Sequence, residues 1–360
     1  MVANRRSSEQ TSRSSISSGA AGVASPFKVE ERDWRGKERW MEGEDSGRVP
    51  HRIHAASDNG SRNLDFFTLF GRGEKKSLIA GADENGFTFL YDLDQRTVHN
   101  ALRLRLNEPK QIDPVSLAVG DALYVMERTP HPDKRCGFET LVYGSEPKPM
   151  DEDDDLGPTY SEDFNDWHWR CLQPPPYVLE PDYEPTRISA YTVVGGSNIW
   201  ISTPGIGTYS FDTLAGKWSK AGKWLLPFRG RADYFPEYNS WLGFTAKSGL
   251  LCSLHLSDAS VRTKPAVHSV LEEDMQEAVG CMLSDAYLVH LGSGKFCVAK
   301  FFHKEYDLVT NEGHVCPQSQ AFAIFTGFVM DQNGPGGALR VRKHKSRRYA
   351  TEVMANGWVF

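Results

Sequence analysis

The sequence predicts an all-β chain folded as a single β-propeller of about six blades. Runs rich in β-branched and aromatic residues recur along the chain, glycine-rich turns separate them, and no long helical pattern interrupts them. The repeats begin about 35 to 45 residues apart, which is the usual period of a propeller blade. One repeat, at residues 189–219, shows the pattern most clearly.

The signature residues of this central repeat are Gly195, Gly196, Trp200, Tyr209, Asp212 and Trp218. The glycine pair accepts the positive φ angles of a hairpin turn between two strand-like runs. The last tryptophan follows the aspartate by six residues, the spacing of a kelch-type repeat, in which this tryptophan packs between neighbouring blades. In kelch repeats the glycine pair follows the second strand, whereas here it precedes that strand. The blade is therefore predicted to be kelch-like.

Residues 1–49 are predicted to form a disordered tail. Arginine and serine are frequent at its start, and no hydrophobic periodicity follows. The same composition suits an organelle transit peptide, which is the alternative interpretation. The propeller domain then takes residues 50–360.

The first repeat spans about residues 65–98, and the second begins near Pro114. An acidic insertion at about residues 146–164 interrupts the second repeat, with five consecutive acidic residues at its centre. Like charges repel one another, so we expect a solvated loop and not a binding site for a cation or a basic partner. Trp167 and Trp169 then resume the blade.

The fourth repeat starts near Trp224, after the central one. The fifth pairs residues 286–291 with 295–299, and the sixth pairs residues 321–330 with 338–341. A propeller removes its exposed edges by closing the ring, often with strands from both chain ends. We therefore expect the C-terminal residues to close the ring beside the region near Asp65.

Several stretches together are specific enough to suggest a family. They are Trp167-His168-Trp169 and residues 174–176, 205–218, 226–232, 290–297 and 344–349. Through them the chain resembles a family of grass proteins, catalogued only as a plant domain of unknown function with a kelch-like, or galactose-oxidase-like, propeller fold. The resemblance implies a fold and brings no activity, cofactor or catalytic residue.

Composition limits the function classes. The net charge of −6 gives no reason to expect a nucleic acid or an anionic membrane as partner. No apolar run approaches the roughly 20 residues that span a bilayer. The six cysteines include no Cys-x-x-Cys pair, so we expect small core hydrophobes in a reduced, intracellular protein of the cytoplasm or nucleus. We also expect a monomer.

No motif predicts catalysis or metal binding. Residues 292–295 resemble part of a phosphate-binding loop, but Phe296 replaces the Ser or Thr that such a loop requires, so a hairpin turn is expected. The eleven histidines include no His-x-His pair. We therefore assign no catalytic residue, metal ligand or cofactor.

Arg229, Arg231, Tyr234 and Glu237 form the candidate partner-binding site. Arginine binds carboxylates through two parallel hydrogen bonds, and tyrosine supplies rigid contact area. Alternatively, Arg231 pairs with an acidic neighbour and braces the loop between blades. The leading hypothesis is a non-enzymatic scaffold that presents propeller loops to a partner protein. An enzyme with its site at the mouth of the central channel is the alternative, since fold alone does not exclude one.

Overall fold

The computed structural model describes residues 27–33, 37–40, 64–73, 76–99, 104–111, 113–145, 165–256, 264–265, 267–269, 281–309, 315–331 and 339–351. Strands dominate these residues, and the helical elements among them are two short 3-10 helices, η1 (Pro176–Leu179) and η2 (Pro236–Tyr238). The prediction of an all-β chain is confirmed.

The first two sheets are four-stranded antiparallel meanders in chain order. The first sheet contains β3 (Leu64–Phe66), β4 (Leu78–Asp83), β5 (Thr88–Asp92) and β6 (Thr97–His99). The second sheet contains β7 (Val115–Val119), β8 (Ala122–Met126), β9 (Phe138–Gly144) and β10 (Asp166–Cys171).

The third and fourth sheets repeat this plan. The third contains β11 (Ala190–Val194), β12 (Asn198–Thr203), β13 (Gly207–Asp212) and β14 (Lys217–Gly222). The fourth contains β15 (Phe228–Phe235), β16 (Ser240–Thr245), β17 (Leu251–Leu254) and β18 (Val267–Ser269). Their first strands, β11 and β15, pair in parallel, so the two meanders form one eight-stranded sheet.

The fifth sheet is larger. It contains β19 (Met282–Gly292), β20 (Lys295–Val309), β21 (Val315–Asp331) and β22 (Arg340–Thr351), followed by β1 (Phe27–Asp33) and β2 (Lys37–Trp40). Strand β1 pairs antiparallel with β22, which joins two segments from opposite ends of the described chain.

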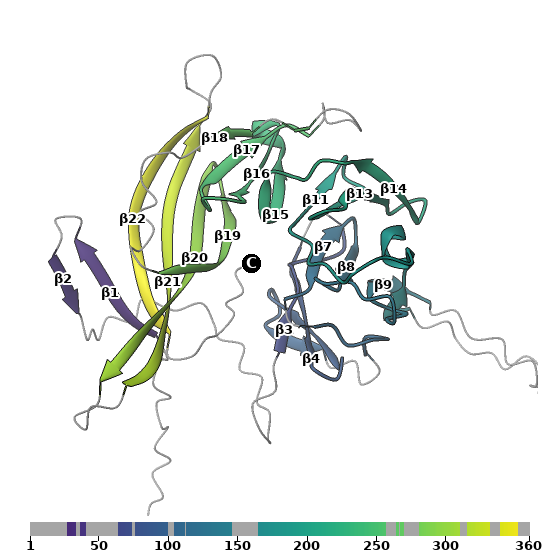
Figure 1. Cartoon of the computed structure of the whole chain (residues 1–360), viewed down its shortest axis with the longest axis horizontal. Helices are drawn as coiled ribbons and strands as arrows, with labels where there is room; N and C mark the ends of the chain where they lie inside the picture. Colours follow the sequence, from purple (N-terminus) through teal and green to yellow (C-terminus); the bar gives the residue numbers. More distant parts are fainter. Residues whose placement is uncertain are drawn as a thin grey trace, which may run out of the picture.

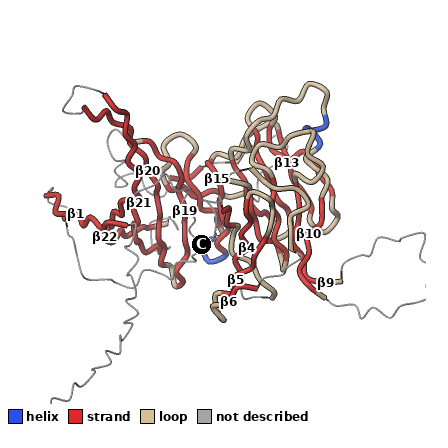
Figure 2. The backbone as a smooth tube through the Cα atoms, turned by 90° about the horizontal axis from the view of Figure 1, so that it is seen from below, coloured by secondary structure: helices blue, strands red, loops and turns tan. Residues whose placement is uncertain are grey.

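The sheets surround a common centre in a propeller-like arrangement, with β3, β7, β11, β15 and β19 as the inner strands (Figure 1). The pairing of β20 with β21 continues past His303, where the pairing of β20 with β19 ends, and Figure 2, turned by 90°, shows the strands from the side. Among the described residues, no strand pairing joins the first sheet to the fifth, and no sheet is closed.

One sequence prediction needs correction near the N-terminus. Strands β1 and β2 lie within residues 1–49, so the prediction of a disordered tail is wrong for these segments. They extend the fifth sheet because β22 offers an edge of unpaired backbone groups. The rest of residues 1–49 and the acidic insertion at 146–164 lie outside the described residues.

The predicted closure beside Asp65 involves C-terminal residues of which 352–360 lie outside the described residues, and in the described part of the chain β3 pairs with β4 alone. Six separate blades are not confirmed. The segments predicted as the fifth and sixth blades form one sheet, because β20 and β21 pair along the whole of β20, from Lys295 to Val309.

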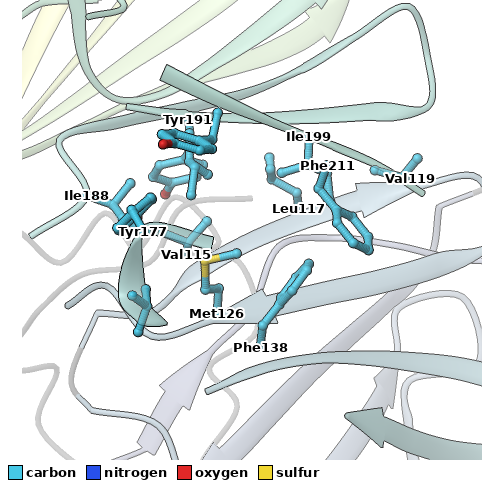
Figure 3. Packing of buried hydrophobic residues seen from close by; sticks show 13 residues of the cluster. Val115, Leu117, Val119, Met126, Phe138, Tyr177, Ile188, Tyr191, Ile199 and Phe211 are labelled. Atoms are coloured by element: carbon cyan, nitrogen blue, oxygen red, sulfur yellow. The ribbon is translucent and has the colours of Figure 1, made fainter. Parts of the chain in front are cut away.

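Buried apolar clusters lie between successive sheets. In the largest, Val115 and Met126 of the second sheet meet Ile199 and Phe211 of the third (Figure 3). A second cluster packs Phe67 and other residues of the first sheet against the second, and a third packs the fourth sheet against the fifth. The second, third and fourth sheets thus bury both faces against their neighbours, as blades of a propeller do.

Trp218 lies between the second and third sheets. Its ring centroid is 5.0 Å from that of Phe211 on its own sheet and 5.7 Å from that of Phe138 on β9. Its indole Nε1 donates a hydrogen bond of 2.9 Å to the carbonyl oxygen of Gln173. The side chain of Asp212 accepts two backbone N–H groups in the turn before β14, which orients this strand.

The other residues of the blade signature are also placed at turns and sheet contacts. Gly195 and Gly196 have φ of 62° and 75° in the turn between β11 and β12. The remaining aromatic contacts are Trp200 with Trp224, Tyr209 with Tyr177, Trp167 with Phe70, and Trp169 with Phe67.

Cys136 and Cys171 form a disulfide, with their Cα atoms 5.0 Å apart. The prediction that the cysteines are unpaired core hydrophobes is therefore wrong for this pair. Pairing of β9 with β10 brings together residues that lie 35 positions apart, and spacing along the chain does not reveal this. Cys252 does fit the prediction, since it is free and completely buried. A disulfide is uncommon in the reducing compartments that the cysteine spacing suggested.

Candidate functional site

Charged and aromatic side chains gather where the inner strands begin. We call this group the inner-strand cluster; hydrogen bonds and charge interactions connect its members. They are Asp65, Asp113, Arg128, Arg187, Tyr191, Arg229, Arg231, Asp233, Asp285 and Tyr287. The inner strands of successive blades run in the same direction, as the parallel pairing of β11 with β15 shows, so residues at their starts meet at one face of the ring.

Asp113 is the carboxylate at the centre of this group. It precedes β7, and its Oδ2 lies 2.5 Å from Nη2 of Arg187 and 3.8 Å from Nη2 of Arg128. The side chain of Arg187 is 56% exposed, whereas that of Arg128 is 8% exposed. The carboxylate of Asp113 is therefore shared between the accessible guanidinium of Arg187 and the buried guanidinium of Arg128.

Arg128 follows β8 and packs against an aromatic ring. Its guanidinium carbon lies 4.9 Å from the ring centroid of Tyr191, a cation–π contact. Burial by itself would lower the pKa of Arg128, but Tyr191 and Asp113 offset it, so the pKa lies above its ordinary value. Its Nε and Nη1 are buried and have no hydrogen-bond partner among the residues that the structure describes.

Arg231 contacts residues of two different sheets. Its Nη2 lies 2.7 Å from Oδ1 of Asp233 on the same strand, and its Nη1 donates a hydrogen bond to Oγ1 of Thr68 beside β3. Arg231 thus pairs with an acidic neighbour, as the alternative sequence interpretation proposed. The same side chain ties the fourth sheet to the first.

The other three residues of the predicted partner site are not all brought together. Arg229 is exposed within the inner-strand cluster, and its Nη2 donates to the carbonyl oxygen of Ser284 at 2.9 Å. Tyr234 lies near the end of β15, and Glu237 lies in η2, which follows that strand. The ring centroid of Tyr234 lies 4.5 Å from that of Trp241, with the rings tilted by 44°, and Oε1 of Glu237 lies 3.0 Å from Nε2 of His290.

Two carboxyl groups in the cluster, those of Asp65 and Asp285, have raised pKa values. Burial raises the pKa of Asp65 to about 6; a backbone hydrogen bond from Asp113 opposes this, and the charges of Asp113 and Glu127 add to it. Burial also raises the pKa of Asp285, helped by Asp113 and opposed by nearby arginines. Such groups occur both in functional sites and in structural ion networks.

Sequence reasoning missed most of this cluster. Asp65, Asp113, Arg128, Arg187 and Asp285 were not recognised, because no local motif connects them. The sequence did contain a signal for these five residues, because each of them lies near the start of an inner strand or near the end of the strand paired with it. Alignment of the repeats by their first strands would have placed them at one face.

A second ion network has a structural role. Nζ of Lys110 lies 2.5 Å from Oε1 of Glu139, which is completely buried, and Nζ of Lys134 lies 2.9 Å from Oε1 of Glu127. The two glutamates also accept backbone N–H groups from Asn107 and Gln111. These bonds hold the segment between the first two sheets against the second.

Within the described residues, no group of three or more His, Cys, Asp or Glu side chains has an arrangement that could hold a metal ion. No helix in that part of the chain is long and apolar enough to cross a membrane.

A family model described as "Protein of unknown function (DUF1668)" matches residues 23–349. The chain belongs to this family. The match begins before β1, so it includes both N-terminal strands of the fifth sheet. No curated protein matches this DUF1668 chain.

Two solved structures show weak likeness to this DUF1668 protein. The N-terminal domain of Nup159 is 12% identical, with 79% of this chain and 69% of that one covered, at a TM-score of 0.31. The extracellular domain of the hybrid two-component system BT3049 from B. thetaiotaomicron is 13% identical, with 77% of this chain and 33% of that one covered, at a TM-score of 0.30. Similarity this low supports no inference about function.

Proposed function

We propose that this DUF1668 protein is a non-enzymatic protein-interaction scaffold, and that the face carrying the inner-strand cluster contacts the partner. One observation carries the proposal. Arg187, in the segment before β11, and Arg229, on β15, are both exposed at the face where the inner strands begin. Exposed arginines beside tyrosines are typical of protein interfaces, because a guanidinium binds carboxylates with defined geometry.

The proposal includes a more specific architecture. We infer a kelch-like ring of about six blades, in which residues outside the described ranges complete the ring between the first and fifth sheets. A monomeric state and a location in the cytoplasm or nucleus belong to the same proposal. In this proposal, Tyr234 and Glu237 form a second, peripheral contact with the partner protein, since Tyr234 is 41% exposed.

An enzyme is the second candidate, and one observation favours it. Asp65 has its pKa raised to about 6 at the ring centre, close to the charge of Asp113. A carboxyl group with a pKa near neutrality can act as a general acid or base. Under this hypothesis, the arginines would bind an anionic substrate.

Proximity labelling in cells tests the scaffold. The full chain is compared with an Arg187→Ala, Arg229→Ala double variant and with a control, Arg340→Ala, Arg342→Ala, which removes two exposed arginines from β22. We expect a defined partner set that the control retains and the first variant loses, with unchanged thermal melts. Retention of all partners by the first variant would refute this face as the interface.

The enzyme hypothesis is tested separately by screening the purified protein for turnover of anionic metabolites. Activity that Asp65→Asn abolishes, with folding intact, would favour the enzyme over the scaffold.

A further inference from the structure

Arg128 is the unusual member of the inner-strand cluster. It is 7% exposed, yet its Nε and Nη1 have no hydrogen-bond partner among the described residues. Native proteins rarely leave buried donors of a charged group without acceptors. The face of its guanidinium is covered by Tyr191, so the side chain is firmly held while Nε and Nη1 remain unused.

The neighbouring carboxylates do not satisfy Arg128. Asp113 lies 3.8 Å from its Nη2 and is held more closely, at 2.5 Å, by Arg187. Asp285 interacts with Arg128, Arg187 and Arg229 together. Three arginines therefore share two carboxylates, which leaves an excess of positive charge at this part of the cluster. The charge interactions of Asp65 are with Asp113 and Glu127 and not with these three arginines.

We propose that Arg128 and Arg187 form a binding centre for a single carboxylate, supplied by a Glu or Asp side chain of the partner protein. The chemistry of the site favours a carboxylate over a phosphate. A dianion would be repelled by Asp113 and Asp285, whereas a monoanion matches the excess charge and can accept from a guanidinium. The inference rests on the proposed scaffold function for the source of the carboxylate.

Arg187 is the first residue that the incoming carboxylate contacts. Its side chain is more than half exposed and contacts Asp113 from the solvent side, whereas the free donors of Arg128 are covered. The incoming carboxylate displaces the contact between Arg187 and Asp113, is bound by Arg187, and reaches the unused donors of Arg128. Arg128 is therefore the anchor and Arg187 the mobile clamp.

The test uses the purified full chain and a fluorescently labelled tetraglutamate peptide as the probe. A tetraglutamine peptide of the same length controls for backbone binding, and acetate in competition tests whether a free small carboxylate suffices. We expect tetraglutamate to bind and tetraglutamine not to bind. Arg187→Gln is expected to weaken tetraglutamate binding about tenfold, while Arg342→Gln on β22 has no effect. Equal binding of both peptides, or no loss in Arg187→Gln, would overturn the proposal.

Because Arg128 is buried, a substitution there could destabilise the fold, so NMR supplies a second readout on the unmodified protein. The Nε–H signal of Arg128, assigned with Arg128→Lys, is expected to shift when tetraglutamate is added. An unshifted signal under saturating peptide would also refute the site. If tetraglutamate binds this way but labelling finds no partner, the scaffold proposal fails and the carboxylate site stands. If partners are found but tetraglutamate does not bind, only the carboxylate site fails.

Discussion

Arg231 on β15 donates a hydrogen bond to Oγ1 of Thr68, a residue 163 positions earlier in the chain. The backbone N–H of Thr68 in turn donates to Oγ of Ser116 on β7 at 3.0 Å. Through these two bonds, the inner strand of the fourth sheet is connected to the first and second sheets. The side chain that sequence reasoning assigned to partner binding therefore also stabilises the ring.

Arg231→Ala should lower the free energy of unfolding by about 1–2 kcal/mol, because it removes two hydrogen-bonded contacts and leaves Asp233 without its closest cation. Arg229→Ala is the matched control on the same strand. Arg229 is exposed and donates to one backbone carbonyl, so we expect a loss below about 0.5 kcal/mol. Urea unfolding of both variants measures the difference, and equal losses would contradict a bracing role.

Removal of the Cys136–Cys171 disulfide should destabilise the protein. The bond closes a loop with a sequence separation of 35, for which the loss of chain entropy in the unfolded state predicts about 4 kcal/mol. We expect dithiothreitol to lower the melting temperature of the wild type. A Cys136→Ser, Cys171→Ser variant should melt at the reduced value and show no response to dithiothreitol. A response in that variant would mean that the reductant acts elsewhere.

Gly207 occupies a position that no other residue fits. Its φ is +115°, and a Cβ added there would lie 2.5 Å from the backbone oxygen of Gly222. Gly196 has a φ of +75° with nothing within 4 Å, so it isolates the effect of the backbone angle alone. We expect Gly207→Ala to cost roughly 2–4 kcal/mol and Gly196→Ala about 1 kcal/mol, measured by thermal unfolding. A smaller loss for Gly207→Ala would argue against the close approach of β13 to β14.

Asp65→Asn should stabilise the protein in a pH-dependent manner. The folded state raises the pKa of Asp65 from 3.8 to about 6, so it binds a proton more tightly than the unfolded state does. Stability from this group is therefore greatest below about pH 4, falls as the pH rises toward about 6, and is constant above.

Substitution by asparagine removes the free-energy cost of ionising Asp65 in the folded state. Because Asp65 is only partly buried, we expect a gain of about 1 kcal/mol at about pH 8 and none at about pH 4, relative to the wild type at each pH. Urea unfolding at the two pH values tests this. A gain of equal size at both would show that ionisation of Asp65 is not its cause.

Local features of the sequence determined the strands and turns. Residues 189–219 were predicted to form a meander from period-2 alternation and glycine turns, and β11 to β14 occupy that stretch. The turn with Gly195 and Gly196 has the positive φ angles expected of it. These features depend on a few consecutive residues, so their physical causes can be read directly from the chain.

The tertiary structure alone decided which distant residues meet. Arg231 with Thr68, Cys136 with Cys171, and β1 with β22 are contacts whose partners no local pattern specifies. The same holds for the merging of the last two predicted blades into the fifth sheet. Such contacts follow from the register of paired strands and from packing of one sheet on the next. Both depend on the whole folded chain, and so the inner-strand cluster became visible only in the folded protein.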